Sequence, residues 1–203
     1  YERNKEAADT ENRYILTCKN TDKICIFTNK GQMHLLKVLD LPYGKFRDKG
    51  IPIDNLSNYD SSEENFIYII NLGAIIHSRL LFGTKTAMLK MVDGSEFDVA
   101  KRTTASTKLN EDDELLIVHA MTGEETVVMQ SEKEMFLRIE ASTIPEKKKG
   151  AVGVRGMKLN AGDALSNIYV LDGENEQTVE VKGKEVVLNR LRVGNRDTKG
   201  TKR

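Results

Sequence analysis

The sequence lacks several features that would point to other classes of protein. It has no tryptophan, only three prolines and no long apolar run, and 31% of its 203 residues are charged. This composition is typical of a globular protein in water and excludes a membrane span, so we expect no membrane partner. The basic and acidic residues balance at 31 each, so net charge alone indicates no partner. The polar opening Tyr1-Glu2-Arg3-Asn4 has no signal peptide, and we expect a fragment of a longer polypeptide.

Cysteine and histidine are also scarce. Cys18 and Cys25 are the only cysteines, and His34, His77 and His119 are scattered without the spacing of metal ligands. Because protein cores accommodate free thiols readily, we expect buried free cysteines, with a disulfide or a metal pair as the alternative. We therefore expect no metal and no cofactor, and a reducing, cytoplasmic compartment.

Short β-rich runs follow one another from residue 14 onward, after a polar lead-in at residues 1–13. They are rich in Val, Ile, Phe, Tyr and Leu and are bounded by turns such as Asn-Lys-Gly and Asp-Gly. The runs are Tyr14–Thr17, Lys23–Thr28, Met33–Leu39, Phe66–Ile70, Leu80–Phe82, Met88–Val92, Leu115–His119, Thr126–Met129, Met135–Ile139, Ile168–Leu171, Thr178–Val181 and Glu185–Leu191. The sequence therefore predicts an all-β fold, with a short helix or an ordered segment in the lead-in.

The runs recur along the chain. Lys108-Leu109-Asn110 and Lys158-Leu159-Asn160 each precede an acidic turn and lie 50 residues apart. Units of this length with four short strands favour a propeller-like array over a sandwich. We predict one domain at 14–203, with units at about 14–72, 78–122, 125–172 and 177–203, the last of them partial.

Charge follows the same repeat. Residues 101–108 and 147–158 contain basic but no acidic residues, acidic turns follow them, and residues 190–203 hold six basic residues against Asp197. Equivalent loops of a radial repeat occupy equivalent places, so the sequence predicts a basic band, which would bind DNA or another polyanion, and a separate acidic band. The expected DNA contacts are Lys45, Arg47, Lys101, Arg102, Lys108, Lys147, Lys148, Lys149, Arg155 and Lys158.

Some alternatives stay open at this point. The acidic loops, and not the basic ones, could form the interface of a protein-binding propeller. A β-rich enzyme is a third hypothesis, but no paired acids, Ser/His/Asp set or metal cluster supports it. Gly150, Gly153 and Gly156 either let the backbone approach phosphates or shape a bulge or a tight strand.

Three motifs resemble a known family. The stretch 144–159, Ile-Pro-Glu-Lys-Lys-Lys-Gly-Ala-Val-Gly-Val-Arg-Gly-Met-Lys-Leu, resembles the blade-closing motif in the C-terminal domain of bacterial gyrase and topoisomerase IV A subunits. Residues 88–97 look like the second strand and outer loop of the preceding blade, and residues 27–33 match the T-x-x-G hairpin turn of the family. The resemblance covers about residues 14–193. The gyrase Q-R-R-G-G-K-G box is absent, with residues 147–153 as its nearest relative, which favours topoisomerase IV or a gyrase with weak supercoiling.

The resemblance implies a β-pinwheel, a propeller-like disc whose four-stranded blades exchange strands, with about three complete blades and a partial one here. It implies non-sequence-specific binding and bending of double-stranded DNA around a basic perimeter, in the service of an ATP-dependent type II topoisomerase. The catalytic tyrosine and metal site of the family lie elsewhere in the holoenzyme, so this chain is expected to be non-catalytic by itself. The implied partners are DNA, the N-terminal catalytic part of the same polypeptide and the ATPase B subunit, at the bacterial nucleoid.

Overall fold

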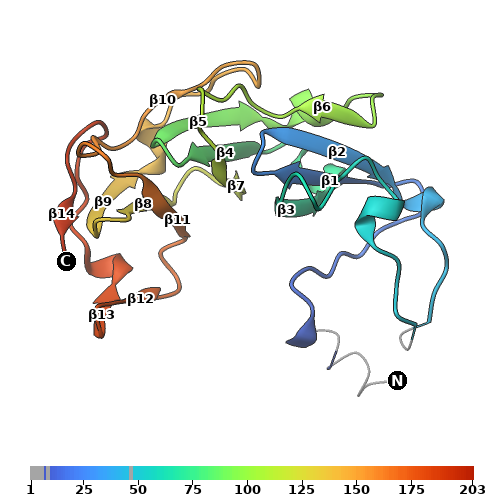
Figure 1. The fold of residues 1–203 in the computed structure, drawn as a ribbon, viewed down its shortest axis with the longest axis horizontal. Coiled ribbons are helices and arrows are strands. Elements are labelled where there is room, and N and C mark those ends of the chain that lie inside the picture. Colours follow the sequence, from blue (N-terminus) through green and yellow to red (C-terminus); the bar gives the residue numbers. More distant parts are fainter. Residues whose placement is uncertain (1–6, 8–9, 46–47) are drawn as a thin grey trace.

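The computed structural model describes residue 7, residues 10–45 and residues 48–203. These residues form three four-stranded antiparallel sheets and a two-stranded hairpin, which follow one another along an arc (Figure 1). The predicted all-β fold is confirmed. No helix in the described ranges is long and apolar enough to cross a membrane.

Each unit is built on a β-hairpin, to which further strands are added. The hairpins are β1 (Lys23–Thr28) with β2 (Gln32–Lys37), β4 (Arg79–Thr84) with β5 (Met88–Asp93), β8 (Thr126–Ser131) with β9 (Met135–Glu140), and β12 (Thr178–Val181) with β13 (Lys184–Val187). The inner strands are β3 (Phe66–Asn71), β7 (Leu115–Met121) and β11 (Leu165–Leu171), and the short outer strands are β6 (Thr103–Ala105), β10 (Val154–Arg155) and β14 (Thr201–Lys202). The helical turns are η1 (Val38–Asp40), η2 (Ile53–Asn55), α2 (Leu72–Ile75), η3 (Gly94–Phe97), η4 (Ala141–Thr143) and η5 (Leu188–Arg190).

The last residue of every hairpin turn has a positive φ, in the left-handed region of backbone conformations. The same turn conformation therefore recurs in each unit. Gly31, Ala87, Glu134 and Gly183 have φ of 74°, 63°, 61° and 75°. Glycine adopts this conformation without strain, whereas a residue with a Cβ incurs a cost of roughly 1–2 kcal/mol. The second and third hairpins therefore keep a turn geometry that their own turn residues do not favour, and the surrounding sheet imposes it.

The outer strand of each complete sheet comes from the next unit along the chain. β6 follows the β4–β5 hairpin in sequence but pairs with β2, and in the same way β10 pairs with β5 and β14 with β9. From the convex to the concave side of the arc, the orders are therefore β6-β2-β1-β3, β10-β5-β4-β7 and β14-β9-β8-β11 (Figure 1). This is the exchange of strands that the resemblance implied. Within the described residues, the last hairpin has no third strand.

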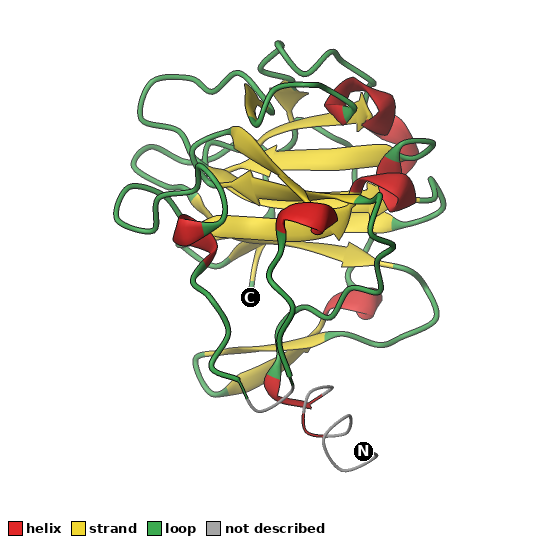
Figure 2. Cartoon of the chain, turned by 90° about the vertical axis from the view of Figure 1, so that its right-hand side faces the viewer, coloured by secondary structure: helices red, strands yellow, loops and turns green. Residues whose placement is uncertain are grey.

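Neighbouring blades pack face to face through apolar clusters. Phe27 of the first blade meets Phe82 and Phe97 of the second at ring-centroid distances of 6.0 and 5.0 Å, both edge-to-face. Two further clusters join the second blade to the third and the third to the last hairpin. In the view turned by 90°, the strands of the blades lie above one another and the turns gather at their ends (Figure 2). Blade-to-blade packing therefore fixes where the connecting segments lie.

Several predicted strands differ from the observed ones. Residues 14–17 form no strand, because this segment contacts the first blade through the Tyr14 hydroxyl, which donates to the Ile67 carbonyl, and not through a backbone ladder. The strands predicted to end at Leu39 and Leu191 end at Lys37 and Val187, where η1 and η5 turn the chain toward the next blade. Most of the lead-in at residues 1–13 lies outside the described residues.

Candidate nucleic-acid interface

The expected DNA contacts that the structure describes lie on one kind of structural element. After the second and third hairpins, a crossing segment passes to the preceding blade, adds its outer strand there and returns as the inner strand of its own blade. The segment after the first hairpin only returns as an inner strand, and the segment after the last hairpin only adds its outer strand, β14. The four crossing segments span residues 38–65, 94–114, 141–164 and 188–203, and each begins with a short helical turn. Because β6, β10 and β14 are outermost in their sheets, the second, third and fourth crossing segments follow the convex edge of the arc (Figure 1).

The structure brings most of the expected contacts to this convex edge. Lys101 and Arg102 precede β6 and Lys108 follows it. Lys147, Lys148 and Lys149 precede β10, Arg155 lies on it and Lys158 follows it. All of these are exposed except Lys149, which is partly buried. These cations of the second and third crossing segments therefore lie along the same edge of the fold, and their contact with DNA stays a prediction.

Two expected contacts are not part of this band. Lys45 is exposed on the first crossing segment, which extends away from the blades at the right of Figure 1. No blade precedes the first one in the described residues, so this segment has no sheet on which to add a strand. Arg47 lies outside the described residues.

Three acids reduce the positive charge of the band. Arg102 pairs with Asp40 at 3.6 Å, Lys148 with Glu96 at 3.5 Å and Arg155 with Asp197 at 2.5 Å. Exposed pairs of this kind contribute little in water, so a phosphate competes for the cations at small cost. Within the described part of the chain, Lys101, Lys108, Lys147 and Lys158 form no ion pair.

The fourth crossing segment extends the band and is missing from the expected contacts. It is joined to the third by backbone hydrogen bonds from Asp197 N to Gly156 O, 2.8 Å, and from Lys158 N to Thr198 O, 2.9 Å. A hollow of about 350 Å³ at its base is lined by several cations, including Arg138, Arg192, Lys199 and Arg203. The six basic residues at 190–203 could have indicated this part of the band from the sequence. They were not among the expected contacts because the sequence predicted only a partial unit there. Residues 101–108, 147–158 and 190–203 are called the basic rim below.

The sequence left two roles open for the glycines of the third crossing segment: to let the backbone approach phosphates, or to shape a bulge or a tight strand. Gly153 has φ 104°, and a Cβ there would lie 2.6 Å from the Leu89 carbonyl oxygen. A Cβ on Gly156 would lie 2.5 Å from Leu89 Cδ1. These two glycines therefore allow β10 to approach β5, which is the tight-strand alternative. Gly150 is exposed with open space around it.

The acids that recur after the basic loops have a structural cause. Asp113 accepts hydrogen bonds from Thr86 N at 3.0 Å and Thr86 Oγ1 at 2.5 Å. Asp163 accepts from Ser131 Oγ at 2.7 Å and Lys133 N at 3.2 Å, so each acid holds the hairpin turn of its own blade. Hydrogen bonds from Lys30 and Lys85 lower the pKa of Glu114 to about 2. The regular spacing of these acids therefore does not require a binding partner.

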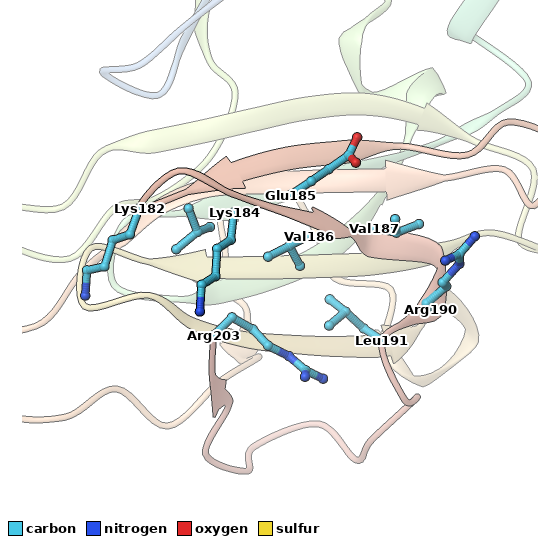
Figure 3. A pocket seen from close by; sticks show the side chains of 9 residues that line it. Lys182, Lys184, Glu185, Val186, Val187, Arg190, Leu191 and Arg203 are labelled. Atoms are coloured by element: carbon cyan, nitrogen blue, oxygen red, sulfur yellow. The ribbon is translucent and has the colours of Figure 1, made fainter.

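Other groups that could mark a functional site do not form a catalytic or metal site in the described residues. Cys18 and Cys25 are free thiols, and burial raises the pKa of Cys25 to about 12. No group of three or more His, Cys, Asp or Glu is placed to hold a metal ion in the described residues. A groove of about 520 Å³ follows the free edge of β13, with Val186, Val187 and Leu191 at its base and Arg203 on its rim (Figure 3). Its lining contains no nucleophile next to a base, so it does not support the enzyme hypothesis.

A row of antiparallel blades that exchange strands, with basic crossing segments on its outer edge, defines a β-pinwheel module. A family model described as "DNA gyrase C-terminal domain, beta-propeller" matches residues 78–120 and 125–172. The curated relatives include the DNA gyrase A subunits of Staphylococcus epidermidis, 31% identical over 93% of this chain, and of Lawsonia intracellularis, 29% identical over 92%. The chain spans only 22% and 24% of the length of these two relatives.

Solved structures share the fold. The C-terminal domain of DNA topoisomerase IV has a TM-score of 0.83 at 21% identity, over 98% of this chain and 66% of that one. The E. coli ParC C-terminal domain has a TM-score of 0.76 at 14% identity, over 93% and 79%. The chain is therefore similar in sequence to the DNA gyrase A subunits and shares the fold of the C-terminal domains of topoisomerase A subunits, as its motifs indicated.

Proposed function

We propose that this chain binds double-stranded DNA along its basic rim without reading sequence, and that it bends the DNA around the arc. The observation that supports this most is the strand exchange itself. It places equivalent crossing segments at the convex edge of successive blades, so their cations recur along one curved surface. Duplex DNA carries one charge per ~1.7 Å of axis, which suits a surface that offers cations at intervals and no fixed base contacts.

Bending the duplex requires several contacts at once. Smoothly bending 20–30 base pairs by 40–90° costs on the order of 1–6 kcal/mol. Each crossing segment of the rim presents at least two cations, so the contacts of successive blades together offset this cost. A single blade would bind DNA without being able to hold it bent.

In its wider setting, we propose that the chain serves an ATP-dependent type II topoisomerase of bacterial cytoplasm, at the nucleoid. The N-terminal catalytic part of the same polypeptide and the ATPase B subunit would be its partners, and the chain alone would not be catalytic and would need no cofactor. The curated relatives named above are gyrase A subunits, which supports this setting. The missing Q-R-R-G-G-K-G box favours topoisomerase IV, or a gyrase with weak supercoiling.

The salt dependence of binding tests the proposal. A labelled linear duplex of about 30 base pairs, the length that a bend of this kind involves, is titrated with the chain at several salt concentrations. The slope of log K against log salt is about −0.9 per phosphate neutralised, so one contact each from Lys101, Lys108, Lys147 and Lys158 gives a slope of about −4. A slope near zero, or a strong preference for one short sequence, contradicts the proposal.

A further inference from the structure

Lys90, in the middle of β5, has its ammonium group inside the protein beneath the third crossing segment. The residue is only 1% exposed. Its Nζ donates hydrogen bonds to the carbonyl oxygens of Lys148 at 3.2 Å, Lys149 at 2.9 Å and Ala151 at 2.6 Å. The Nζ also lies 5.5 Å from the centre of the Phe82 ring. A lysine is rarely buried unless its ammonium group is fully hydrogen-bonded, as it is here. These hydrogen bonds therefore hold the turn at residues 148–151 against β5.

In the described residues, no other blade has an ammonium group at this position, although Arg138 of β9 donates to the Asn189 and Leu191 carbonyls of the fourth crossing segment at 2.5 and 3.2 Å. The pairing of β2, β5 and β9 with their outer strands places His34, Lys90 and Leu137 at equivalent positions. His34 bonds Thr103 and Glu64, and Leu137 has no polar group to offer. An ammonium that gathers three carbonyls is therefore a particular feature of the second blade, and it lies below the densest basic part of the rim.

We propose that Lys90 is a positioning residue of the basic rim, which draws the carbonyls of residues 148–151 inward and so presents the lysines of this turn to DNA. This inference rests on the proposed DNA binding. Phosphate is repelled by carbonyl oxygens and attracted by ammonium groups, so the direction in which the turn faces decides whether it binds. The exposed side chain of Lys148, 87% accessible, is consistent with a turn whose cations point outward.

The same bonds connect two parts of the rim. Thr107 Oγ1 of the second crossing segment donates to Ala151 O at 3.4 Å, and Ala151 O is also bound by Lys90. On its other side, the turn is held by Glu96, which accepts from Lys149 N at 3.0 Å. Without the ammonium of Lys90, the Lys149 carbonyl would lose its hydrogen bond, and the Lys148 and Ala151 carbonyls would keep only those from Ala151 N and Thr107 Oγ1. We therefore expect the turn to open and to expose carbonyl oxygens on the face proposed to meet DNA.

A double-mutant cycle tests this role. Lys90→Met is made in the wild-type chain and in a chain that carries Lys147→Ala, Lys148→Ala and Lys149→Ala. If Lys90 acts through the turn, the substitution lowers duplex affinity about tenfold in the wild type and less than about twofold when the lysines of the turn are absent. Lys19→Met removes one exposed charge elsewhere in the chain and serves as the matched control. Equal losses from Lys90→Met in both backgrounds, or no loss in either, overturn the inference.

Hydrogen exchange separates this inference from the proposed function. Lys90→Met is expected to speed amide exchange at residues 148–152, and unchanged exchange there overturns the inference whatever the DNA result. If the wild-type chain does not bind duplex DNA at all, the proposed function fails, while the exchange result still decides whether Lys90 orders the turn. Lys90→Gln, which keeps two N–H donors, replaces Lys90→Met in the cycle if that variant does not fold.

Discussion

At the scale of single residues, the burial of Lys90 gives the fold a dependence on pH. Burial lowers the pKa of Lys90 from its ordinary 10.5 to about 8, against the opposing effect of Glu96. Below pH 8 the ammonium is charged in both the folded and the unfolded chain, so the full penalty for burying it is present. Between pH 8 and 10.5 the unfolded chain binds more protons than the folded one. The free energy of unfolding therefore rises with pH in this window.

The expected result is a difference between two pH profiles. From pH 8 to pH 9, the free energy of unfolding of the wild type is expected to rise by about 1 kcal/mol relative to that of Lys90→Met, measured by urea denaturation. Cys25 acts in the opposite direction above pH 9, because its folded pKa is raised, but it does so in both proteins and cancels in the difference. Parallel profiles for the two proteins would show that Lys90 keeps an ordinary pKa.

The sequence predicted the cations of the rim but not the residue beneath them. The sequence alone identified Lys101, Lys108 and Lys147, because each lies in a run of residues that contains several basic and no acidic side chains. Lys90, in contrast, stands in the run Met-Leu-Lys-Met-Val, where one lysine in a strand usually marks a face open to water. Burial of Lys90 follows from the third crossing segment lying over β5, and that contact joins residues about 60 positions apart.

At the scale of elements, the third crossing segment depends on close backbone contact with β5. Only Val154 and Arg155 pair in β10, so the strand itself provides few hydrogen bonds. Gly156 N donates to Ala87 O at 2.7 Å and Lys147 N to Met91 O at 2.8 Å, which holds the segment at both ends. Gly153 lies between these points, and a Cβ there would lie 2.6 Å from the Leu89 carbonyl oxygen.

A matched pair of glycine substitutions checks this dependence. Gly153→Ala places a Cβ against the Leu89 carbonyl and forces a side chain into φ 104°, so it is expected to lower the free energy of unfolding by about 2–4 kcal/mol. Gly150→Ala, three residues away in open space, is expected to change it by less than about 0.5 kcal/mol. Thermal and urea unfolding of both variants give the comparison. Similar effects at the two positions would refute the close approach of β10.

The hairpins and the crossing strands differ in how well the sequence predicts them. β1–β2 and β8–β9 were predictable because each combines two β-rich runs with a short turn, all within about 15 residues. β10 and β14 have only two residues each and pair with a hairpin of the preceding unit, so no local pattern identifies their partners. That pairing followed only from the resemblance of the motifs to a family with exchanged strands.

At the scale of the whole molecule, the proposed DNA binding would depend on the arrangement of cations along the curved rim and not on total charge. The chain is neutral overall, yet the three stretches of the basic rim carry an excess of cations and belong to segments that follow the convex edge (Figure 1). Several of the acids that balance them are used within blades, as in the bonds of Asp113 and Asp163 to hairpin turns. Because strand exchange fixes the order of these segments, the positive surface is built by the fold. A polyanion that follows the edge meets each blade in turn.

The central part of the rim is the place to test this organisation. Lys147, Lys148 and Lys149 lie on the third crossing segment, between the second and the fourth. Changing all three to Ala is expected to weaken duplex binding and to flatten the slope of log K against log salt by about two units. The expected change is not three, because the Lys149 Nζ already donates to the Glu96 carbonyl and is partly buried. The fold should persist, since exposed lysines affect stability by less than about 0.5 kcal/mol.

The control is a second triple variant with the same loss of charge. Lys19, Lys23 and Lys133 lie on turns and strand ends outside the basic rim, and changing them to Ala removes three positive charges as well. Long-range attraction depends on the total charge, whereas counterion release depends on the phosphates actually contacted, so only the rim variant should change the salt slope. Both variants are measured side by side on one duplex over one series of salt concentrations. Equal losses of affinity with equal changes in slope would mean that diffuse charge holds the DNA, and the assignment of the rim would then be wrong.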